Sequence, residues 1–310
     1  MSKTAGETLF QRILVPLDGS LQAETILYQA QQLLCGKKGD VLLLHVWDAA
    51  SAAEPGALAT PAAAEKYLKG VESRLTPFGA RVRRVLRTGA VETALLETIQ
   101  AEAISLVALS SHGRRTSALA PVAGTIERIV RVSDVPVLVA RAFQSGEDGQ
   151  LVAARCEPSS IRRILVPLDG SSASEAVLPY ARELGQLLGA LMVLLHVDPM
   201  RPGGSEEFVG SRVSGAPTGP KPGTEASGEE RIAYAAKTFS SVGLETMTLT
   251  QGGDPVSTIL EFAKPSAVDL IALSTHAHGG QTDRLIGSVA HRVLKDSILP
   301  TLLLKAPAPA

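Results

Sequence analysis

The stretch ILVPLDGS occurs at residues 13–20 and again, unchanged, at residues 164–171. In each copy a run of strand-forming apolar residues leads into aspartate, glycine and serine, which is typical of a buried strand that ends in a turn. The proline of each copy lacks the N–H group that a sheet ladder needs, so we expect it near the carboxyl end of its strand. The sequence therefore predicts that Asp18 and Asp169 lie at the carboxyl edge of a sheet.

The duplication extends along the chain. LLLHVWD (42–48) recurs as VLLHVDP (193–199), and ISLVALSSHG (104–113) recurs as VDLIALSTHA (268–277). A repeat of this length predicts two similar domains joined head to tail. The later motifs are spaced more widely than the earlier ones, which places an insertion rich in proline, glycine and serine at 198–230.

Each half alternates strand patterns with helix patterns. Because the strands are apolar on both faces, they indicate an α/β fold with an open parallel sheet that is covered on both sides. We expect domains at 1–142 and 161–306, with 143–160 as a polar linker. The expected strands lie near 11–18, 40–47, 81–87, 104–110, 135–140, 162–169, 190–197, 244–250, 268–274 and 299–304, and the first expected helix covers 20–35.

The composition excludes several classes of protein. The chain has 310 residues, a formal net charge of −1 and no long basic run, which argues against binding to nucleic acid or to an anionic membrane. Cys35 and Cys156 lie far apart and match no metal or disulfide spacing. The first residues lack a signal-peptide pattern, and no apolar run approaches the roughly 20 residues of a membrane helix. We therefore expect a cytoplasmic protein without a structural metal.

The carboxyl edge of each predicted sheet suits a nucleotide. If the first and fourth strands flank a crevice, each aspartate faces the end of the fourth strand, where ligands of open parallel sheets bind. After that strand, Gly-Thr at 124–125 and Gly-Ser at 287–288 open a helix, and a helix N-terminus suits a phosphate. One wall then carries a carboxylate for a base amino group, and the other carries a phosphate cradle.

Simpler interpretations stay open for the same residues. An aspartate followed by Gly-Ser is often only a turn and a helix cap. His45 and His196 lie inside apolar strands, as core histidines do, and the loop histidines His112, His276 and His278 have no carboxylate or cysteine that completes a metal set. The sequence contains no GxSxG, no GxxxxGK[ST] and no GxGxxG after a strand.

Taken together, the repeated ILVPLDGS, the LLHV that ends the second strand, GGDPVSTIL (252–260) and STHAHGGQTDRLIGSVAHRVL (274–294) resemble the universal stress protein family. The resemblance covers nearly the whole chain and implies two five-stranded domains of the adenine-nucleotide alpha-hydrolase-like fold, with strand order 3-2-1-4-5. It also implies that the two domains pair through their last strands as a pseudo-twofold pair, and it allows a homodimer.

Family members that bind ATP carry Gly-x-x-Gly, nine residues, and then Gly-Ser or Gly-Thr. The second half keeps the nine-residue spacing before Gly287, but both early glycines are replaced, by Ser274 and Ala277. The first half keeps Gly113 but has ten residues before Gly124. The resemblance therefore implies that ATP, accompanied by Mg²⁺, binds mainly to the second half.

The site residues follow from this correspondence. In the second half they are Pro167, Leu168, Asp169, Val197, Ser274, His276, Ala277, Gly287, Ser288 and Val289. The weaker site of the first half comprises Pro16, Leu17, Asp18, Val46, Ser110, His112, Gly113, Gly124 and Thr125.

Three functions compete on this evidence. The first is a cytoplasmic stress-response regulator that binds ATP or a related adenine nucleotide. The second is a stress-induced interaction module whose cleft binds no nucleotide, with a protein partner that the sequence does not name. The third, an ATPase, is disfavoured because the sequence offers no positioned general base and no evident metal-binding carboxylate pair.

Overall fold

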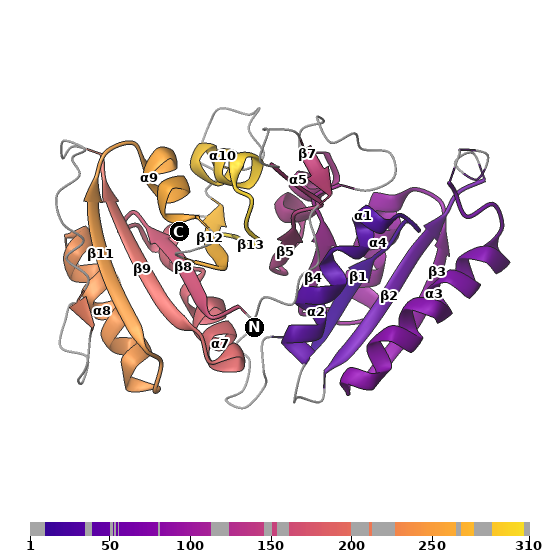
Figure 1. Ribbon diagram of the computed structural model, residues 1–310, viewed down its shortest axis with the longest axis horizontal. Helices are drawn as coiled ribbons and strands as arrows, with labels where there is room; N and C mark the ends of the chain where they lie inside the picture. The colour runs from indigo at the N-terminus through magenta and orange to yellow at the C-terminus, as the bar shows by residue number, and fades with distance from the viewer. Residues whose placement is uncertain are drawn as a thin grey trace. The chain divides into compact units, whose positions relative to one another are not determined.

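The computed structural model describes residues 10–34, 39–49, 52, 54, 56–79, 81–112, 124–145, 151–153, 161–199, 211–212, 227–264, 268–275 and 287–306. The chain forms two compact units, Met1–Ser159 and Ser160–Ala310, which Figure 1 shows in the indigo-to-magenta and magenta-to-yellow parts of its colour range. Each unit is an α/β domain with a parallel sheet.

The sheet of the first unit has the predicted order β3-β2-β1-β4-β5. Its strands are β1 (Arg12–Pro16), β2 (Asp40–Trp47), β3 (Arg81–Thr88), β4 (Leu106–Ser110) and β5 (Val137–Ala140). All of the adjacent pairs are parallel. In the central strand β1, Ile13, Leu14 and Val15 are fully buried, as expected for a parallel sheet covered on both faces.

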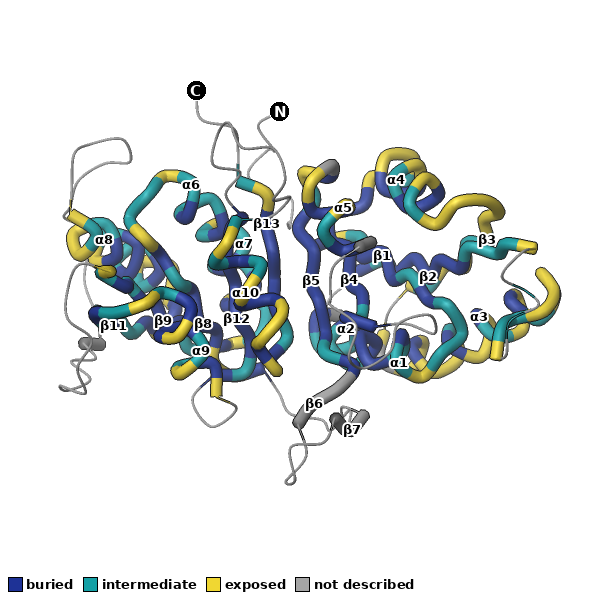
Figure 2. Tube along the Cα trace, turned by 90° about the horizontal axis from the view of Figure 1, so that it is seen from above, coloured by how far each residue is buried: buried dark blue, intermediate teal, exposed yellow. Residues whose placement is uncertain are grey.

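Helices cover both faces of this sheet. They are α1 (Leu21–Glu24), α2 (Ile26–Leu34), α3 (Pro61–Leu75), α4 (Val91–Ala101) and α5 (Gly124–Val132), and a 3-10 turn, η2 (Thr76–Phe78), follows α3. Figure 2 shows α1, α2 and α3 on one side of the strands and α4 and α5 on the other. This arrangement follows from right-handed crossovers that run outward from β1 to β3 and then return to β4.

The second unit repeats this plan with the order β10-β11-β9-β8-β12-β13. Its strands are β8 (Arg163–Leu168), β9 (Leu191–Asp198), β10 (Ser211–Arg212), β11 (Thr246–Gly252), β12 (Leu270–Thr275) and β13 (Thr301–Lys305). Its helices are α6 (Ser172–Glu175), α7 (Leu178–Leu188), α8 (Gly228–Ser241), α9 (Pro255–Phe262) and α10 (Ser288–Asp296). The short strand β10, inside the predicted insertion, runs antiparallel to β11.

One local prediction needs correction, and one segment contains strands that were not expected. The single helix expected at 20–35 is divided at Thr25, whose hydroxyl donates to the Gln22 carbonyl and so competes with the helical ladder. The expected linker at 143–160 contains an antiparallel pair of strands that the sequence did not predict, β6 (Phe143–Ser145) and β7 (Leu151–Ala153), and the domain bounds stay a prediction. The predicted pairing of the two domains through their last strands stays a prediction.

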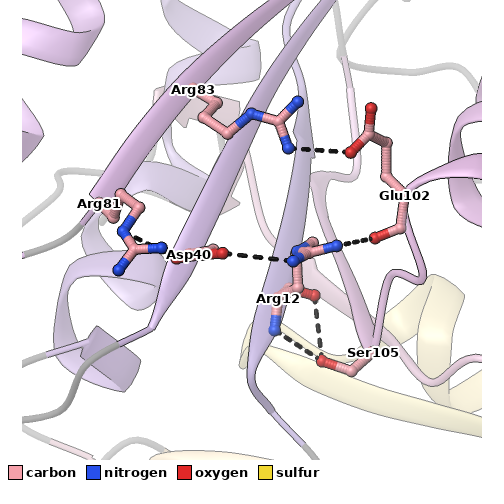
Figure 3. Close-up of polar contacts among 6 residues, drawn as sticks. All are labelled: Arg12, Asp40, Arg81, Arg83, Glu102 and Ser105. Atoms are coloured by element: carbon pink, nitrogen blue, oxygen red, sulfur yellow. Dashed lines mark hydrogen bonds and ion pairs between the residues drawn. The ribbon is translucent and has the colours of Figure 1, made fainter.

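Polar contacts join the strands at the amino edge of the first sheet (Figure 3). The Arg12 backbone N–H donates to the Ser105 hydroxyl over 2.9 Å, and the Arg12 guanidinium donates to the Glu102 carbonyl. The same guanidinium lies 3.4 Å from the Asp40 carboxylate. Two arginines of β3 add ion pairs, Arg81 to Asp40 and Arg83 to Glu102. The charged groups at this edge therefore pair with one another and hold the strands together.

The turn after β8 gives a prediction about stability. Gly170 has a φ of +80°, and a Cβ added to it would lie 3.1 Å from the Gly228 Cα. We expect Gly170→Ala to lower the free energy of unfolding by about 1–3 kcal/mol, as measured by urea unfolding, because alanine is strained at this φ and the neighbouring backbone must move.

Two glycines serve as controls for this substitution. Gly243 has a φ of +84° but open space around it, so Gly243→Ala measures strain alone and should cost less. Gly70 lies in α3 with nothing within 4 Å, so Gly70→Ala should stabilise the protein by about 0.5–1 kcal/mol. A Gly170→Ala variant as stable as the wild type contradicts this account of the turn.

Candidate functional site

In the first unit, Asp18 organises the turn that follows β1. Its Oδ1 accepts from the Ser20 backbone N–H over 2.9 Å and from the Ser20 hydroxyl over 2.6 Å. The Ser20 hydroxyl oxygen in turn accepts from the Ala23 N–H and caps α1. The turn has a positive φ of 88° at Gly19, which explains the glycine after the aspartate. The turn-and-cap interpretation is thus correct, but the serine is the capping residue and the aspartate orients it.

The second unit builds the same turn. The Ser171 N–H donates to Asp169 Oδ1 over 2.9 Å, and the Ser171 hydroxyl caps α6 by accepting from the Ser174 N–H. Asp169 is exposed, whereas Asp18 is half-buried. Both aspartates therefore lie at the carboxyl edge of their sheets. Their role in the turn does not exclude a ligand, because a carboxylate has two oxygens and about four acceptor positions.

A histidine of the neighbouring strand holds the residue that precedes each aspartate. His45 Nδ1 lies 2.7 Å from the Leu17 carbonyl oxygen, and His196 Nδ1 lies 3.1 Å from the Leu168 carbonyl oxygen. Since a carbonyl only accepts, Nδ1 carries the proton and donates in both rings. His45 is buried, as expected for a core histidine. The sequence did not reveal that these repeated histidines position the aspartate turns.

A second carboxylate lies six residues after each aspartate and pairs with an arginine. Glu24 Oε2 lies 2.8 Å from Arg74 on α3, and Glu175 Oε1 lies 3.0 Å from Arg231 on α8. These ion pairs connect the helix after the aspartate turn to the helix after the second strand. The sequence analysis missed both glutamates, although their recurrence at the same place in the two halves is a signal that it contains.

Burial and charge raise the pKa of two groups beside the turns. The pKa of Glu175 is raised mainly by burial and further by the Asp169 charge, although Arg231 acts in the opposite direction. The pKa of Tyr67, on α3, is raised strongly by burial, then by the neighbouring Glu24 and more weakly by Asp18. The Tyr67 hydroxyl therefore keeps its proton at every physiological pH.

The end of β4 is held by hydroxyl contacts. The Ser110 and Thr25 hydroxyl oxygens lie 3.0 Å apart, within hydrogen-bond distance. The buried Ser111 hydroxyl lies 2.8 Å from His112 Nδ1 and accepts from the Ala142 N–H, so it links the end of β4 to the residues after β5. This pair therefore has a structural role. Gly113 lies outside the described residues, and α5 begins at Gly124 with Thr125 as its second residue.

The corresponding wall of the second unit is described in part. The buried Ser274 hydroxyl, at the end of β12, donates to the Ser174 carbonyl over 3.4 Å. Gly287 precedes α10, and the first residue of that helix, Ser288, is exposed while the next, Val289, is half-buried. His276 and Ala277 lie outside the described residues.

Strand order brings the predicted residues to one edge. Because β8 lies between β9 and β12, Asp169 follows the central strand, with Val197 near the end of β9 on one side and Ser274 near the end of β12 on the other. Strand order thus puts these residues at the carboxyl edge of the sheet, as far as the described residues extend, and their role in binding a ligand stays a prediction. Those residues contain no cluster of three or more His, Cys, Asp or Glu that would hold a metal ion.

Of the helices that the structure describes, none has the length and apolar character to cross a membrane.

The raised pKa of Glu175 predicts how stability varies with pH. A carboxyl whose pKa rises on folding holds its proton better in the folded state, so it favours folding below its ordinary pKa of 4.5. That contribution is lost as the pH rises through the raised pKa. We expect Glu175→Gln to flatten this part of a plot of melting temperature against pH. The variant Glu261→Gln, exposed on α9, is the control and should keep the wild-type slope. An unchanged slope in Glu175→Gln contradicts the prediction.

Comparisons with known proteins agree with this architecture. The model of the universal stress protein family matches residues 9–141 and 160–305. Universal stress protein MJ0531 of Methanocaldococcus jannaschii is 29% identical over 146 residues, which are 47% of this chain and 83% of that protein. Universal stress protein YxiE of Bacillus subtilis is 27% identical over 151 residues, which are 46% of this chain and 98% of that protein.

A solved structure resembles the whole chain. The crystal structure of a universal stress protein from Archaeoglobus fulgidus has a TM-score of 0.62 and 16% sequence identity, and the match covers 96% of this chain and 98% of that one. At this identity the likeness supports the fold alone. The family match, in contrast, extends over both halves of the sequence. The chain therefore belongs to the universal stress protein family and carries two domains of that family in tandem.

Proposed function

We propose that this protein is a cytoplasmic stress-response regulator that binds ATP or a related adenine nucleotide, mainly in its second unit. The observation that carries the proposal is the position of Asp169 at the carboxyl edge of β8, between the ends of β9 and β12. Ligands of open parallel sheets bind at this edge, where the strand order reverses.

The two walls of this cleft suit opposite ends of a nucleotide. The Asp169 carboxylate suits the amino group of the base as a hydrogen-bond acceptor, and the backbone at Val197 offers further polar groups. On the other wall, Gly287 leads into α10, whose first N–H groups and positive dipole end suit phosphate. Mg²⁺ would accompany ATP, with the phosphate oxygens as its main ligands.

The second unit is favoured over the first by its spacing. It keeps nine residues between Ala277 and Gly287, as nucleotide-binding relatives do, whereas the first unit has ten between Gly113 and Gly124. An added residue shifts the helix start relative to the loop before it. We therefore assign the tighter ATP site to the second unit.

An interaction module that binds no nucleotide is the second candidate. It is favoured by the replacement of both early glycines in the second half, by Ser274 and Ala277. It is also favoured by the turns, which already use Oδ1 of Asp18 and of Asp169. On this alternative the aspartates serve the fold, and the carboxyl edge contacts a protein partner or a second copy of the chain.

The first test of the proposal removes each aspartate in turn. Asp169→Ala should weaken ATP binding by about 1.5–3 kcal/mol, because a hydrogen bond to a charged acceptor is lost. Asp18→Ala should weaken it less. Isothermal titration calorimetry with ATP and Mg²⁺ measures both effects on the full chain.

The control for this test is Asp296→Ala, which removes a carboxylate from the far end of α10 and should leave ATP affinity unchanged. Equal affinities for the wild type and Asp169→Ala would count against the site. A larger effect of Asp18→Ala would assign the main site to the first unit, and absence of ATP binding by the wild type would favour the interaction module.

The second test concerns turnover. Phosphoryl transfer needs a positioned nucleophile and neutralisation of the charge on the γ-phosphate. The described part of the cradle offers backbone N–H groups and the Ser288 hydroxyl, which suit binding better than transition-state stabilisation. With Mg²⁺ and ATP the purified protein should release phosphate far more slowly than the roughly 1–10³ s⁻¹ of ordinary enzymes. Turnover in that range, lost in Ser288→Ala, would identify an enzyme instead.

A further inference from the structure

The outer edges of the two sheets differ in what covers them. In the second unit the short strand β10 pairs antiparallel with β11, with Ser211 opposite Thr248 and Arg212 opposite Met247. In the first unit β3 is the last strand of its sheet, and no described strand pairs with its outer side (Figure 1). The same edge of the fold is therefore covered in one unit and, as far as the described residues extend, open in the other.

The strands β3 and β11 can be compared residue by residue. Val41 of β2 pairs with Val82, and the equivalent Met192 of β9 pairs with Thr246, which gives an offset of 164 between the two strands. The same offset separates the glycines that follow the helices α3 and α8, whose φ values are +83° and +84°. It therefore holds both for the edge strands and for the helices before them.

Alternate backbone groups of β3 point away from the sheet. The Arg81 N–H donates to the Gly39 carbonyl over 3.2 Å and so points toward β2. Because successive residues of a strand direct their N–H and C=O groups to opposite sides, those of Val82, Arg84 and Leu86 point outward. A row of outward donors and acceptors is a template for another strand.

The second unit shows how a strand adds at this position. Arg84 corresponds, at the offset of 164, to Thr248, and Thr248 is opposite Ser211 of β10. The edge of this fold therefore accepts an antiparallel strand at the place where β3 is open. Extended peptides that bind proteins in this way gain affinity from main-chain hydrogen bonds and specificity from side chains.

Arginines give the open edge a positive charge. β3 contains four of them, Arg81, Arg83, Arg84 and Arg87, and all four are exposed. The residues at the equivalent positions of the second unit are not basic: Glu245, Met247, Thr248 and Gln251. The charge is therefore a property of the first unit and not of the fold.

Neighbouring carboxylates balance only part of this charge. Arg81 shares the Asp40 carboxylate with an arginine of β1 (Figure 3). Arg83 and Arg84 each pair with one glutamate. Arg87 is exposed and forms no ion pair within the part of the chain that the structure describes. These five arginines thus share three carboxylates, and the set keeps an excess of positive charge.

The charge and the backbone together select the occupant. A second copy of β3 would place arginines opposite arginines, and like charges at facing positions of two strands are destabilising. An acidic strand would place carboxylates there instead. Arg81, Arg83 and Arg87 lie on one face of β3, since side chains two residues apart share a face. The alternating outward N–H and C=O groups match a peptide backbone, whereas a nucleic acid offers the C=O groups few donors.

We propose that β3 is a docking edge for an extended acidic segment of a partner protein. The segment adds an antiparallel strand along Val82–Leu86 and directs its carboxylates to the face that carries Arg81, Arg83 and Arg87. This surface belongs to the outer strand of the sheet, and its use requires no nucleotide.

The test uses a labelled synthetic peptide, Thr-Glu-Val-Glu-Val-Glu-Thr, whose glutamates share one face when it is extended. Fluorescence anisotropy with the full chain, without nucleotide, should show saturable binding that weakens as salt is added. A peptide with lysine for each glutamate should bind at least ten-fold more weakly because its charge is reversed. A peptide with proline for each valine should do the same, because it keeps the charge but lacks the N–H groups that face β3.

Protein variants separate the charge from the main chain. Arg87→Glu should weaken binding at least ten-fold, whereas Arg131→Glu, which makes the same change in net charge at an exposed position of α5, should bind as the wild type does. Arg84→Pro should weaken binding at least ten-fold. Arg84→Gln loses the same charge but keeps the outward N–H, so its affinity should stay within three-fold of the wild type. Circular dichroism melting curves verify that each variant is folded.

The proposal is overturned if the acidic peptide does not bind, if the lysine or proline peptide binds equally well, or if Arg87→Glu has no effect. Tighter binding of a single-stranded DNA oligonucleotide at the same salt concentration would also overturn it, because the arginines would then attract any polyanion. The outcome does not depend on ATP affinity, so this inference and the proposed function can fail separately.

Discussion

The hydrogen bond from a strand histidine to the carbonyl before each aspartate is the contact on which the carboxyl edge depends. At this point the chain leaves the sheet, and Leu17 would leave a buried carbonyl without a partner if His45 did not donate to it over 2.7 Å. With that carbonyl held, the next residues turn back through a glycine with positive φ, and Asp18 accepts from Ser20. The cap of α1, the direction of the helix and the position of the aspartate all follow from this one anchor.

The two units solve the same electrostatic problem in different ways. A glutamate six residues after the aspartate adds a second negative charge, which is unfavourable in a half-buried corner unless a cation offsets it. In the second unit the cation is Arg231, directly opposite Glu175, whereas in the first it is Arg74, which reaches Glu24 from farther along α3. Because Arg74 balances Glu24 in the first unit, the position equivalent to Arg231 is occupied there by Tyr67. A rearrangement that leaves the fold unchanged thereby puts a tyrosine at the position where the second unit has an arginine.

The main strands could be predicted from the sequence because the signals for a strand lie within the strand itself and the turn after it. Runs that are apolar on both faces predicted the parallel strands, and the proline and Asp-Gly-Ser of each repeat predicted where β1 and β8 end. Contacts between distant elements were not predictable in this way. Nothing near Glu24 in the chain indicates that Arg74, fifty residues later, is its partner, and nothing marks the Tyr67 hydroxyl as buried. The strands β6 and β7 were missed because their residues read as polar linker.

The two units also differ in how closely a helix packs against the second strand of the sheet. A Cβ added to Gly228 would lie 2.2 Å from the His196 ring, so α8 approaches β9 more closely than an alanine there would allow. The equivalent residue of α3 is Ala64, which is fully buried and carries the methyl group that Gly228 lacks. In the second unit this close approach and the side chain of Arg231 fill the space beside the aspartate turn. In the first unit Tyr67 occupies the position equivalent to Arg231, and its pKa is raised by burial and by the charge and hydrogen bond of Glu24. Duplication has therefore kept one fold in both units, while the packing beside the two aspartate turns has diverged.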